Sequence, residues 1–318
     1  MKNIQTLNNE VSVDQLGFTL IHEHLLFQFD EKFKEKSIDF TRKELIKLKG
    51  NGGKTVVDLT PFKKIHWLKE IAKEIDLNLL CCTGYYIEDV IKNFSSLDIF
   101  HLDSDRHSAF MEKEILEGIE DTKIKAAIIK VAGAGYTLTP WEEAVFTAAA
   151  KAQIKTKTPI ATHACTGAAE QQRVLLKAGA NPDYIFFSHI EAKFGWEGRN
   201  LKQQCEHLLN IVKEGSYLLF NNFGFEFDTP KDEIIYILKY LSDKGYMNNL
   251  LISVDMNYQV NEEGSIILEA ADGYPECEKR VYSYLLTDVV PVLKAAGFSS
   301  ENVDTLFVKN PMRFFNYL

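Results

Sequence analysis

The chain has 318 residues, a formal net charge of -9 at pH 7, and 46% hydrophobic and 25% charged residues. This composition is typical of a globular protein with a large core. The negative charge leaves no broad basic surface for a nucleic-acid backbone or an anionic membrane, so we expect a small-molecule substrate as the partner. The five cysteines show no CxxC spacing, which argues against a disulfide framework.

The N-terminal segment, MKNIQTLNNEVSVDQ, lacks the apolar run of a signal peptide. No uncharged apolar stretch of the chain reaches the roughly 20 residues that a membrane helix needs. We therefore expect a cytoplasmic protein.

Eight short apolar runs recur along the chain, and most are continuous rather than alternating in hydrophobicity. Such runs are typical of parallel strands that are covered on both faces. The runs are FTLIH (18–22), TVVDLT (55–60), LNLLCCTG (77–84), AAIIKVAG (126–133), PIATHAC (159–165), YIFFSHI (184–190), SYLLF (216–220) and LLISVDM (250–256).

Helix-patterned segments separate these runs, and several end in glycine, as helices commonly do. The last of them, residues 281–297, contains Pro291, which we expect to kink or interrupt it. Strand-like runs and helix-patterned segments alternate along the chain, and no linker divides them into separate domains. This pattern predicts an α/β fold in which residues 1–318 form a single (β/α)8 TIM barrel. An open doubly wound sheet is the alternative, but GAG at 133–135 lacks the third glycine of a nucleotide-binding fingerprint.

Polar side chains stand at the carboxyl ends of several predicted strands. His22 and His24, in GFTLIHEHLL, lie on one face if the strand continues through them. In a barrel of this kind, the carboxyl ends of the strands form the active-site face. The residues expected on that face are His22, His24, Lys130, His163, His189 and Asp255.

Each of these residues alone has a structural explanation, such as a hydrogen-bonded core histidine or a strand-end cap. Their joint placement on one rim favours a metal centre, because buried polar groups require partners. Nitrogen and oxygen donors suit zinc, manganese, cobalt or iron. The remaining histidines fall in helical or polar segments and are expected at the surface: His66, His101, His107 and His207.

These motifs resemble the phosphotriesterase-like lactonase branch of the amidohydrolase superfamily. GFTLIHEHL matches the family signature, and the resemblance continues through VVDLT, TGYY, IIKVAG, THA, SHI, SVDM and KNPMRFF. It implies two divalent metal ions, with zinc expected, and a carbon dioxide-derived carbamate on Lys130 that bridges them. The other ligands that it implies are His22, His24 and Asp255 for one ion, and His163 and His189 for the second.

The resemblance also implies the reaction, which is attack of a metal-bridging hydroxide on an ester carbonyl. Asp255 is the candidate to accept the proton of that hydroxide. Tyr86, in TGYY, matches a tyrosine that faces the bridging solvent in lactonase relatives, with rim packing as the alternative. We therefore expect a lactonase that acts on a sugar lactone or a phosphorylated sugar lactone.

Substrate contacts are expected from the loops, above all from the long segment 257–279, a candidate lid or pocket wall. Basic side chains in such loops can bind a phosphate or carboxylate, although solvated surface charge is the alternative. The candidate substrate-binding residues are Lys193, Arg199, Tyr258 and Arg280.

Two further functions stay open at this point. One is a phosphotriesterase or another phosphoester hydrolase, including a metal-dependent deoxyribonuclease on a similar barrel. The other is a catalytically silent barrel that binds a metabolite or a partner protein, but such a barrel would be expected to have lost a ligand. Relatives often form homodimers, so a homodimer is also expected.

Overall fold

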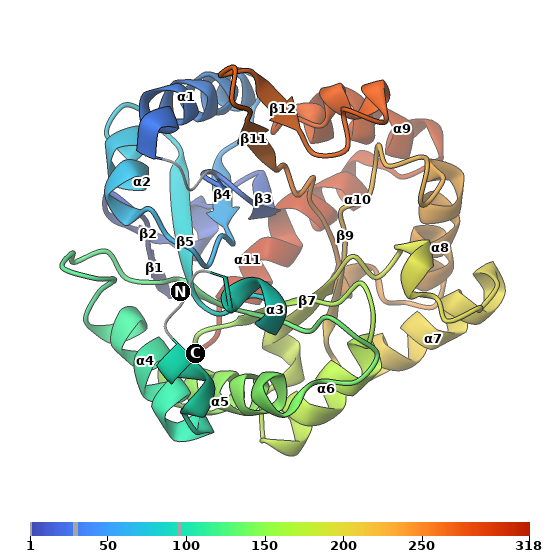
Figure 1. Cartoon of the computed structure of the whole chain (residues 1–318). Helices are drawn as coiled ribbons and strands as arrows, with labels where there is room; N and C mark the ends of the chain where they lie inside the picture. The colour runs from blue at the N-terminus through green and yellow to red at the C-terminus, as the bar shows by residue number, and fades with distance from the viewer. Residues whose placement is uncertain (1, 28–30, 94–96) are drawn as a thin grey trace.

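The computed structural model describes residues 2–27, 31–93 and 97–318 and shows a barrel of parallel strands surrounded by helices (Figure 1). The sheet has eight strands in the order β10-β9-β8-β7-β6-β5-β4-β3. Each predicted run overlaps one of them, so the predicted TIM barrel is confirmed. The strands are β3 (Thr19–Glu23), β4 (Thr55–Asp58), β5 (Asn78–Gly84), β6 (Ile128–Ala132), β7 (Ile160–His163), β8 (Ile185–Ser188), β9 (Tyr217–Phe220) and β10 (Leu250–Ile252).

Helices follow the strands along the chain and cover the outside of the barrel (Figure 1). Within the described ranges, capping boxes start three of these helices, at Thr139, Asn200 and Ser299, where the side chain of the cap and that of the third helical residue satisfy each other's backbone N–H groups. The helices are α1 (Lys34–Gly50), α2 (Ile65–Ala72), α3 (Glu88–Ile91), α4 (Ser104–Leu116), α5 (Pro140–Thr156), α6 (Ala168–Lys177), α7 (Leu201–Lys213), α8 (Lys231–Asp243), α9 (Val290–Ala295), α10 (Ser300–Asp304) and α11 (Asn310–Phe315).

The expected helix at 281–297 is irregular, as Pro291 predicts. A π-helical turn covers Leu285–Val289, and α9 begins directly after it. Pro291 lies in the first turn of α9 and has no N–H to donate to the carbonyls of the π-helical turn before it, which accounts for the irregular helix there.

Two apolar clusters make up the core, one inside the barrel and one between the strands and the helices. Cys82, Phe186 and Leu219 belong to the inner cluster, and Cys81 belongs to the outer one. Successive strand residues point to opposite faces, so neighbouring cysteines pack in different clusters. Both thiols are buried core groups.

The barrel closes between its first and last strands. Two backbone hydrogen bonds are formed there: Asp255 N to His22 O and His24 N to Met256 O, both 3.2 Å. Short hairpins flank the barrel: β1 (Asn3–Gln5) with β2 (Glu10–Ser12), and β11 (Tyr258–Val260) with β12 (Ile266–Leu268). The long segment after β10 is therefore partly ordered as a hairpin.

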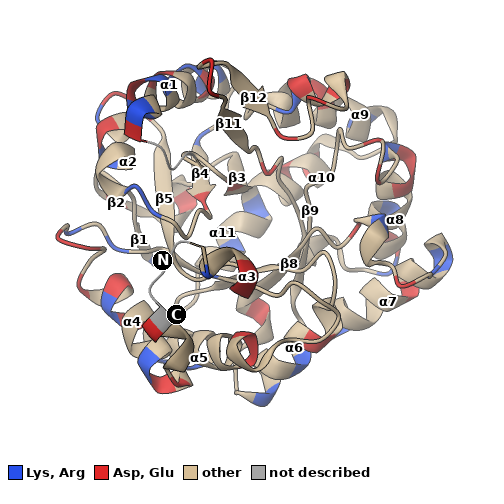
Figure 2. Ribbon diagram, in the orientation of Figure 1, with Lys and Arg blue, Asp and Glu red and all other residues tan. Residues whose placement is uncertain are grey.

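Charged residues lie mostly on the outer helices and loops, with both signs interspersed (Figure 2). None of the helices in the described ranges is long and apolar enough to cross a membrane.

The prediction that four histidines lie at the surface is wrong for one of them, His107. His66 and His101 are exposed and His207 is half-buried, but His107 is fully buried beside Tyr85 and Trp141. It was expected in a polar stretch, yet it lies on the inward face of α4, where the neighbouring aromatic rings enclose it.

Candidate metal centre

The predicted ligand residues meet at the carboxyl ends of the strands. His22 lies on β3 and Lys130 on β6, and the Nε2 atom of His22 is 3.2 Å from Nζ of Lys130. His163 is the last residue of β7, and His189 directly follows β8. Their ring centroids are 4.5 Å apart. Strand ends that are distant in sequence therefore place these side chains in one cluster.

Asp255 is at the centre of this cluster. Its Oδ1 atom lies 3.5 Å from Nε2 of His22 and 3.2 Å from Nε2 of His24. Its Oδ2 atom lies 3.2 Å from Nε2 of His189. One carboxylate thus contacts imidazoles from both sides of the cluster.

Two residues of the cluster adopt the left-handed backbone conformation without being glycine. His189 has a φ of 59° and Asp255 a φ of 53°. Each such conformation costs about 1–3 kcal/mol and is found where the surrounding structure enforces it, often at functional sites. Here it turns both side chains away from the strand path and toward the other ligands.

The protonation states suit metal binding. Burial, and then the charge on Lys130, hold the pKa of His22 well below its ordinary value, and burial lowers that of His189 to about 4. These rings are therefore neutral and keep a nitrogen lone pair. Burial raises the pKa of Asp255, but a proton taken up by the cluster stays on the facing histidines and attracts the carboxylate, which holds the pKa of Asp255 well below its usual range, so this carboxylate is ionised.

A hydrogen-bonded chain fixes the orientation of His24. Nδ1 of His24 is 2.9 Å from the Thr60 hydroxyl, which donates to Oδ1 of Asp58 at 2.7 Å. Because that hydroxyl proton is used by Asp58, the hydroxyl oxygen accepts from Nδ1 of His24, and Nε2 is left free to face the cluster. Such outer contacts commonly orient metal-binding histidines.

Asn221 is a site residue that the sequence reasoning missed. Its side-chain amide donates to Oδ2 of Asp255 at 3.1 Å. The backbone N–H groups of Asn221 and Asn222 both donate to Oε1 of buried Glu191 at 2.6 Å. Asn221 directly follows β9, so the strand-end rule that selected the histidines would also have selected it.

A cavity of about 410 Å³ opens above the cluster. Its wall is rich in aromatic rings, and Tyr86 contacts His163 edge-on with centroids 5.4 Å apart. Cys165 forms part of the wall, with Sγ 3.3 Å from Nε2 of His163. The other residues that line it include Phe27, Phe194, Phe225, Phe227, Asn222, Asp228, Asn257 and Glu269.

Two of the predicted substrate-binding residues are buried behind this wall. The Tyr258 hydroxyl lies 2.8 Å from that of Thr41 and donates to the carbonyl of Ser37 at 3.0 Å. The Arg280 guanidinium donates to the carbonyls of Phe223, Asn221 and Val254. These side chains therefore support the loops and do not line the cavity.

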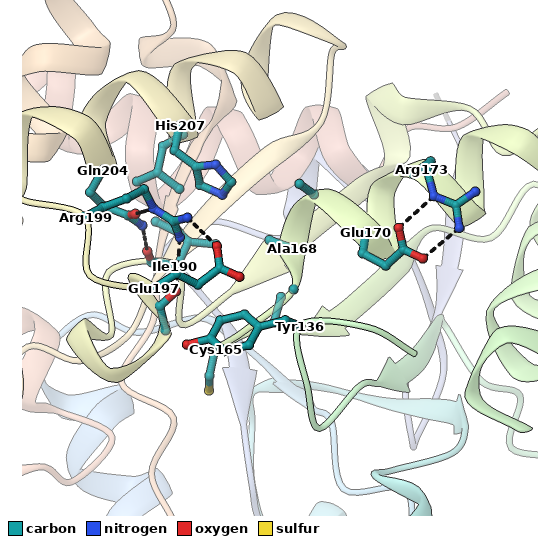
Figure 3. Close-up of a pocket in the computed structure, with 15 residues that line it drawn as sticks. Tyr136, Cys165, Ala168, Glu170, Arg173, Ile190, Glu197, Arg199, Gln204 and His207 are labelled. Carbon is teal, nitrogen blue, oxygen red and sulfur yellow. Dashed lines mark hydrogen bonds and ion pairs between the residues drawn. The ribbon is translucent and has the colours of Figure 1, made fainter. Parts of the chain in front are cut away.

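The other two predicted substrate-binding residues also point elsewhere. Nζ of Lys193 forms an ion pair with Glu233 at 2.8 Å. Arg199 lies in a neighbouring cavity of about 360 Å³, where it bonds Glu197 and Gln204 (Figure 3). Among the described residues, the wall of the cavity above the cluster contains no lysine or arginine.

The cluster fits a metal centre. Two buried atoms of the cluster form no hydrogen bond with any described residue, namely Oδ1 of Asp255 and Nδ1 of His22. Neutral imidazoles and an ionised carboxylate are the donors that zinc and similar divalent ions take. His22, His189 and Asp255 have ligand atoms close enough together to hold one ion.

The fold and this site define the class of protein: a metal-dependent hydrolase on a TIM barrel, acting on ester or phosphoester bonds. The sequence model of the phosphotriesterase family matches residues 2–315. The chain belongs to the phosphotriesterase family, a family of binuclear metal hydrolases.

Several relatives are similar over nearly their whole length. The phosphotriesterase homology protein of Escherichia coli is 29% identical, over 96% of this chain and 100% of the relative. The aryldialkylphosphatase of Saccharolobus solfataricus is 27% identical, over 97% and 98%. The solved organophosphorus hydrolase of Deinococcus radiodurans has a TM-score of 0.84 at 28% identity, over 99% of this chain and 97% of that one.

A further solved structure is described as organophosphate hydrolysis engineered from a weak promiscuous lactonase template. It has a TM-score of 0.85 at 27% identity, with 99% of this chain and 100% of that chain covered.

Proposed function

We propose that this protein is a binuclear metal-dependent lactonase that hydrolyses an uncharged lactone, with sugar lactones included. The main support is the cavity wall above the cluster. Tyr86 and several phenylalanines face the cavity, and within the described chain no lysine or arginine does. An uncharged ring fits such a wall, because a phosphate would be buried there without a cation to pair with it.

The ligands proposed for the two ions are the six residues that the sequence predicts. Zinc is proposed because its preferred donors are the histidine nitrogens and carboxylate oxygens present here. When bound, the ions would supply Lewis-acid activation of water and of the substrate oxygen. The proposed ligands are His22, His24, Lys130, His163, His189 and Asp255.

A carbamate on Lys130 is part of this proposal. Lys130 is fully buried, and burial lowers the pKa of its ammonium to about 8, so a fraction of the side chain is the neutral amine near neutral pH. The neutral amine attacks carbon dioxide, a C–N bond forms, and one proton leaves to solvent. The product is an anion with two oxygens in place of a buried cation beside His22.

Two side chains of this protein would act on the substrate. The ionised carboxylate of Asp255 accepts the proton of the attacking water, and Asn221 holds that carboxylate in place. Burial raises the pKa of Tyr86, so its phenol keeps its proton and can donate a hydrogen bond to the lactone. Tyr86 therefore orients the ring above the cluster.

Phosphotriester hydrolysis is the second candidate. It is favoured by the similarity to an aryldialkylphosphatase and to an organophosphorus hydrolase over almost the whole chain. The aromatic wall is also compatible with an aryl leaving group.

Proton release, followed with a pH indicator, tests the proposal. Protein loaded with zinc, manganese or cobalt is mixed with uncharged γ- and δ-lactones, matched phosphorylated sugar lactones and one aryl phosphotriester. We expect fastest turnover on an uncharged lactone. Turnover confined to the phosphotriester would make phosphoryl transfer the function, and turnover confined to phosphorylated lactones would contradict the reading of the cavity wall.

A further inference from the structure

Glu23, the residue between the two histidines of the first strand, faces the last strand and not the metal cluster. It is fully buried. Its Oε1 atom accepts hydrogen bonds from the Ser253 hydroxyl at 2.7 Å and from the Val254 N–H at 3.0 Å. Its Oε2 atom accepts from the Met256 N–H at 2.8 Å. One carboxylate thus takes three hydrogen bonds from the segment that follows β10.

These bonds lie where the barrel closes. The Ser253 hydroxyl also accepts a hydrogen bond from the His22 N–H at 3.0 Å. β3 and β10 stand at the two ends of the strand order, and side chains therefore join them beside the two backbone hydrogen bonds between these strands. The side-chain hydrogen bonds of Glu23 and Ser253 thus stand where a regular pair of strands would form further backbone hydrogen bonds.

Asp255 lies between the two backbone groups that Glu23 holds. The N–H groups of Val254 and Met256 both point at the carboxylate, and Asp255 between them has the left-handed φ of 53°. A residue other than glycine keeps this conformation only where its surroundings enforce it. The carboxylate of Glu23 supplies that restraint on both sides of Asp255.

We infer that Glu23 is a positioning residue of the metal centre. It fixes the turn that presents Asp255, while its chain neighbours His22 and His24 present two imidazoles to the same cluster. It therefore sets the distance between the ligands of β3 and the ligand that follows β10. This inference rests on the proposed metal site.

Glu23→Gln tests the inference with almost no change in volume. An amide has one accepting oxygen and a donating NH2 group, so it places a donor against the N–H of Val254 or Met256. Glu142→Gln is the matched control, because Glu142 is also buried and accepts two backbone hydrogen bonds, from Ala134 and Thr139. Glu142 holds the start of α5 and contacts none of the proposed ligands.

Cobalt(II) titration of the full chain, read by its visible absorption and by equilibrium dialysis, is the first measurement. For Glu23→Gln we expect cobalt binding weakened by about 10- to 100-fold and a changed absorption spectrum. With saturating metal we expect a lower kcat with a smaller change in KM. Glu142→Gln should lose thermal stability and keep the wild-type cobalt affinity and spectrum.

Wild-type cobalt affinity and spectrum in folded Glu23→Gln would overturn the inference, and so would equal losses in both variants. If Glu23→Gln does not fold, Ser253→Ala carries the test. It removes one donor to Glu23, and unchanged cobalt binding there would equally overturn the inference. Failure of the wild-type chain to bind cobalt would instead overturn the proposed metal site.

Discussion

The floor and the wall of the cavity are built in different ways. The floor consists of strand-end residues that are at most 8% exposed apart from half-buried His163, and neighbours such as Thr60 and Asn221 hold them in place. The wall comes from loops, and two of its rings, Phe194 and Phe227, are 63% and 45% exposed. The barrel therefore holds the proposed metal ligands in a buried floor, while the wall that would meet the substrate is formed by more exposed loop residues.

Lys130→Ala should have the largest effect, because it removes the proposed bridge from the floor. We expect loss of bound metal and of activity, both partly restored by a short-chain carboxylate that occupies the space of the carbamate. Metal analysis after dialysis, with and without added acetate or propionate, measures this. Two ions held by the unaided variant would show that Lys130 is not the bridge.

Asp255→Asn should leave the fold and most of the metal in place. Since the amide cannot accept the proton of the attacking water, we expect kcat to fall by about 10²- to 10⁴-fold. Steady-state kinetics at saturating metal, with metal content measured on the same sample, test this. Turnover near that of the wild type would exclude Asp255 as the proton acceptor.

Tyr86→Phe tests the hydrogen bond that Tyr86, which contacts His163 of the floor, is proposed to donate to the lactone. It removes one hydrogen bond to the lactone and keeps the ring, so we expect kcat/KM for lactones to fall by about 3- to 10-fold, as the loss of about 1 kcal/mol predicts. Activity on an aryl phosphotriester should change less. An equal loss on both substrates would assign Tyr86 to packing.

Lys193→Ala should have the smallest effect, because Nζ of Lys193 is already paired with Glu233 outside the cavity. We expect stability within about 0.5 kcal/mol of the wild type and kinetics within about twofold. Thermal unfolding and lactone kinetics measure these. A tenfold rise in KM restricted to phosphorylated lactones would return Lys193 to the substrate site.

The floor was predictable from the sequence and the wall was not. Continuous apolar runs marked the strands, and the strand-end rule then brought His22, His163 and His189 to one face. The direction of a loop side chain depends on how the whole loop folds, so Tyr258 and Arg280 were expected in the cavity and lie behind it.

The contacts of Glu23 could not be predicted from the sequence, for a different reason. Alternation along a strand places it on the face opposite to His22 and His24. That this face meets the end of β10 follows only from closure of the barrel, which joins segments about 230 residues apart, as the Glu23–Ser253 bond shows. A local pattern carries no information on such a contact.

Anomalous X-ray scattering from crystals of the protein grown with zinc or manganese would locate the ions of the proposed binuclear centre. We expect two peaks, roughly 3.5–4 Å apart, between the histidines at the ends of β3, β7 and β8. A single peak, or none at these strand ends, would contradict a binuclear centre there.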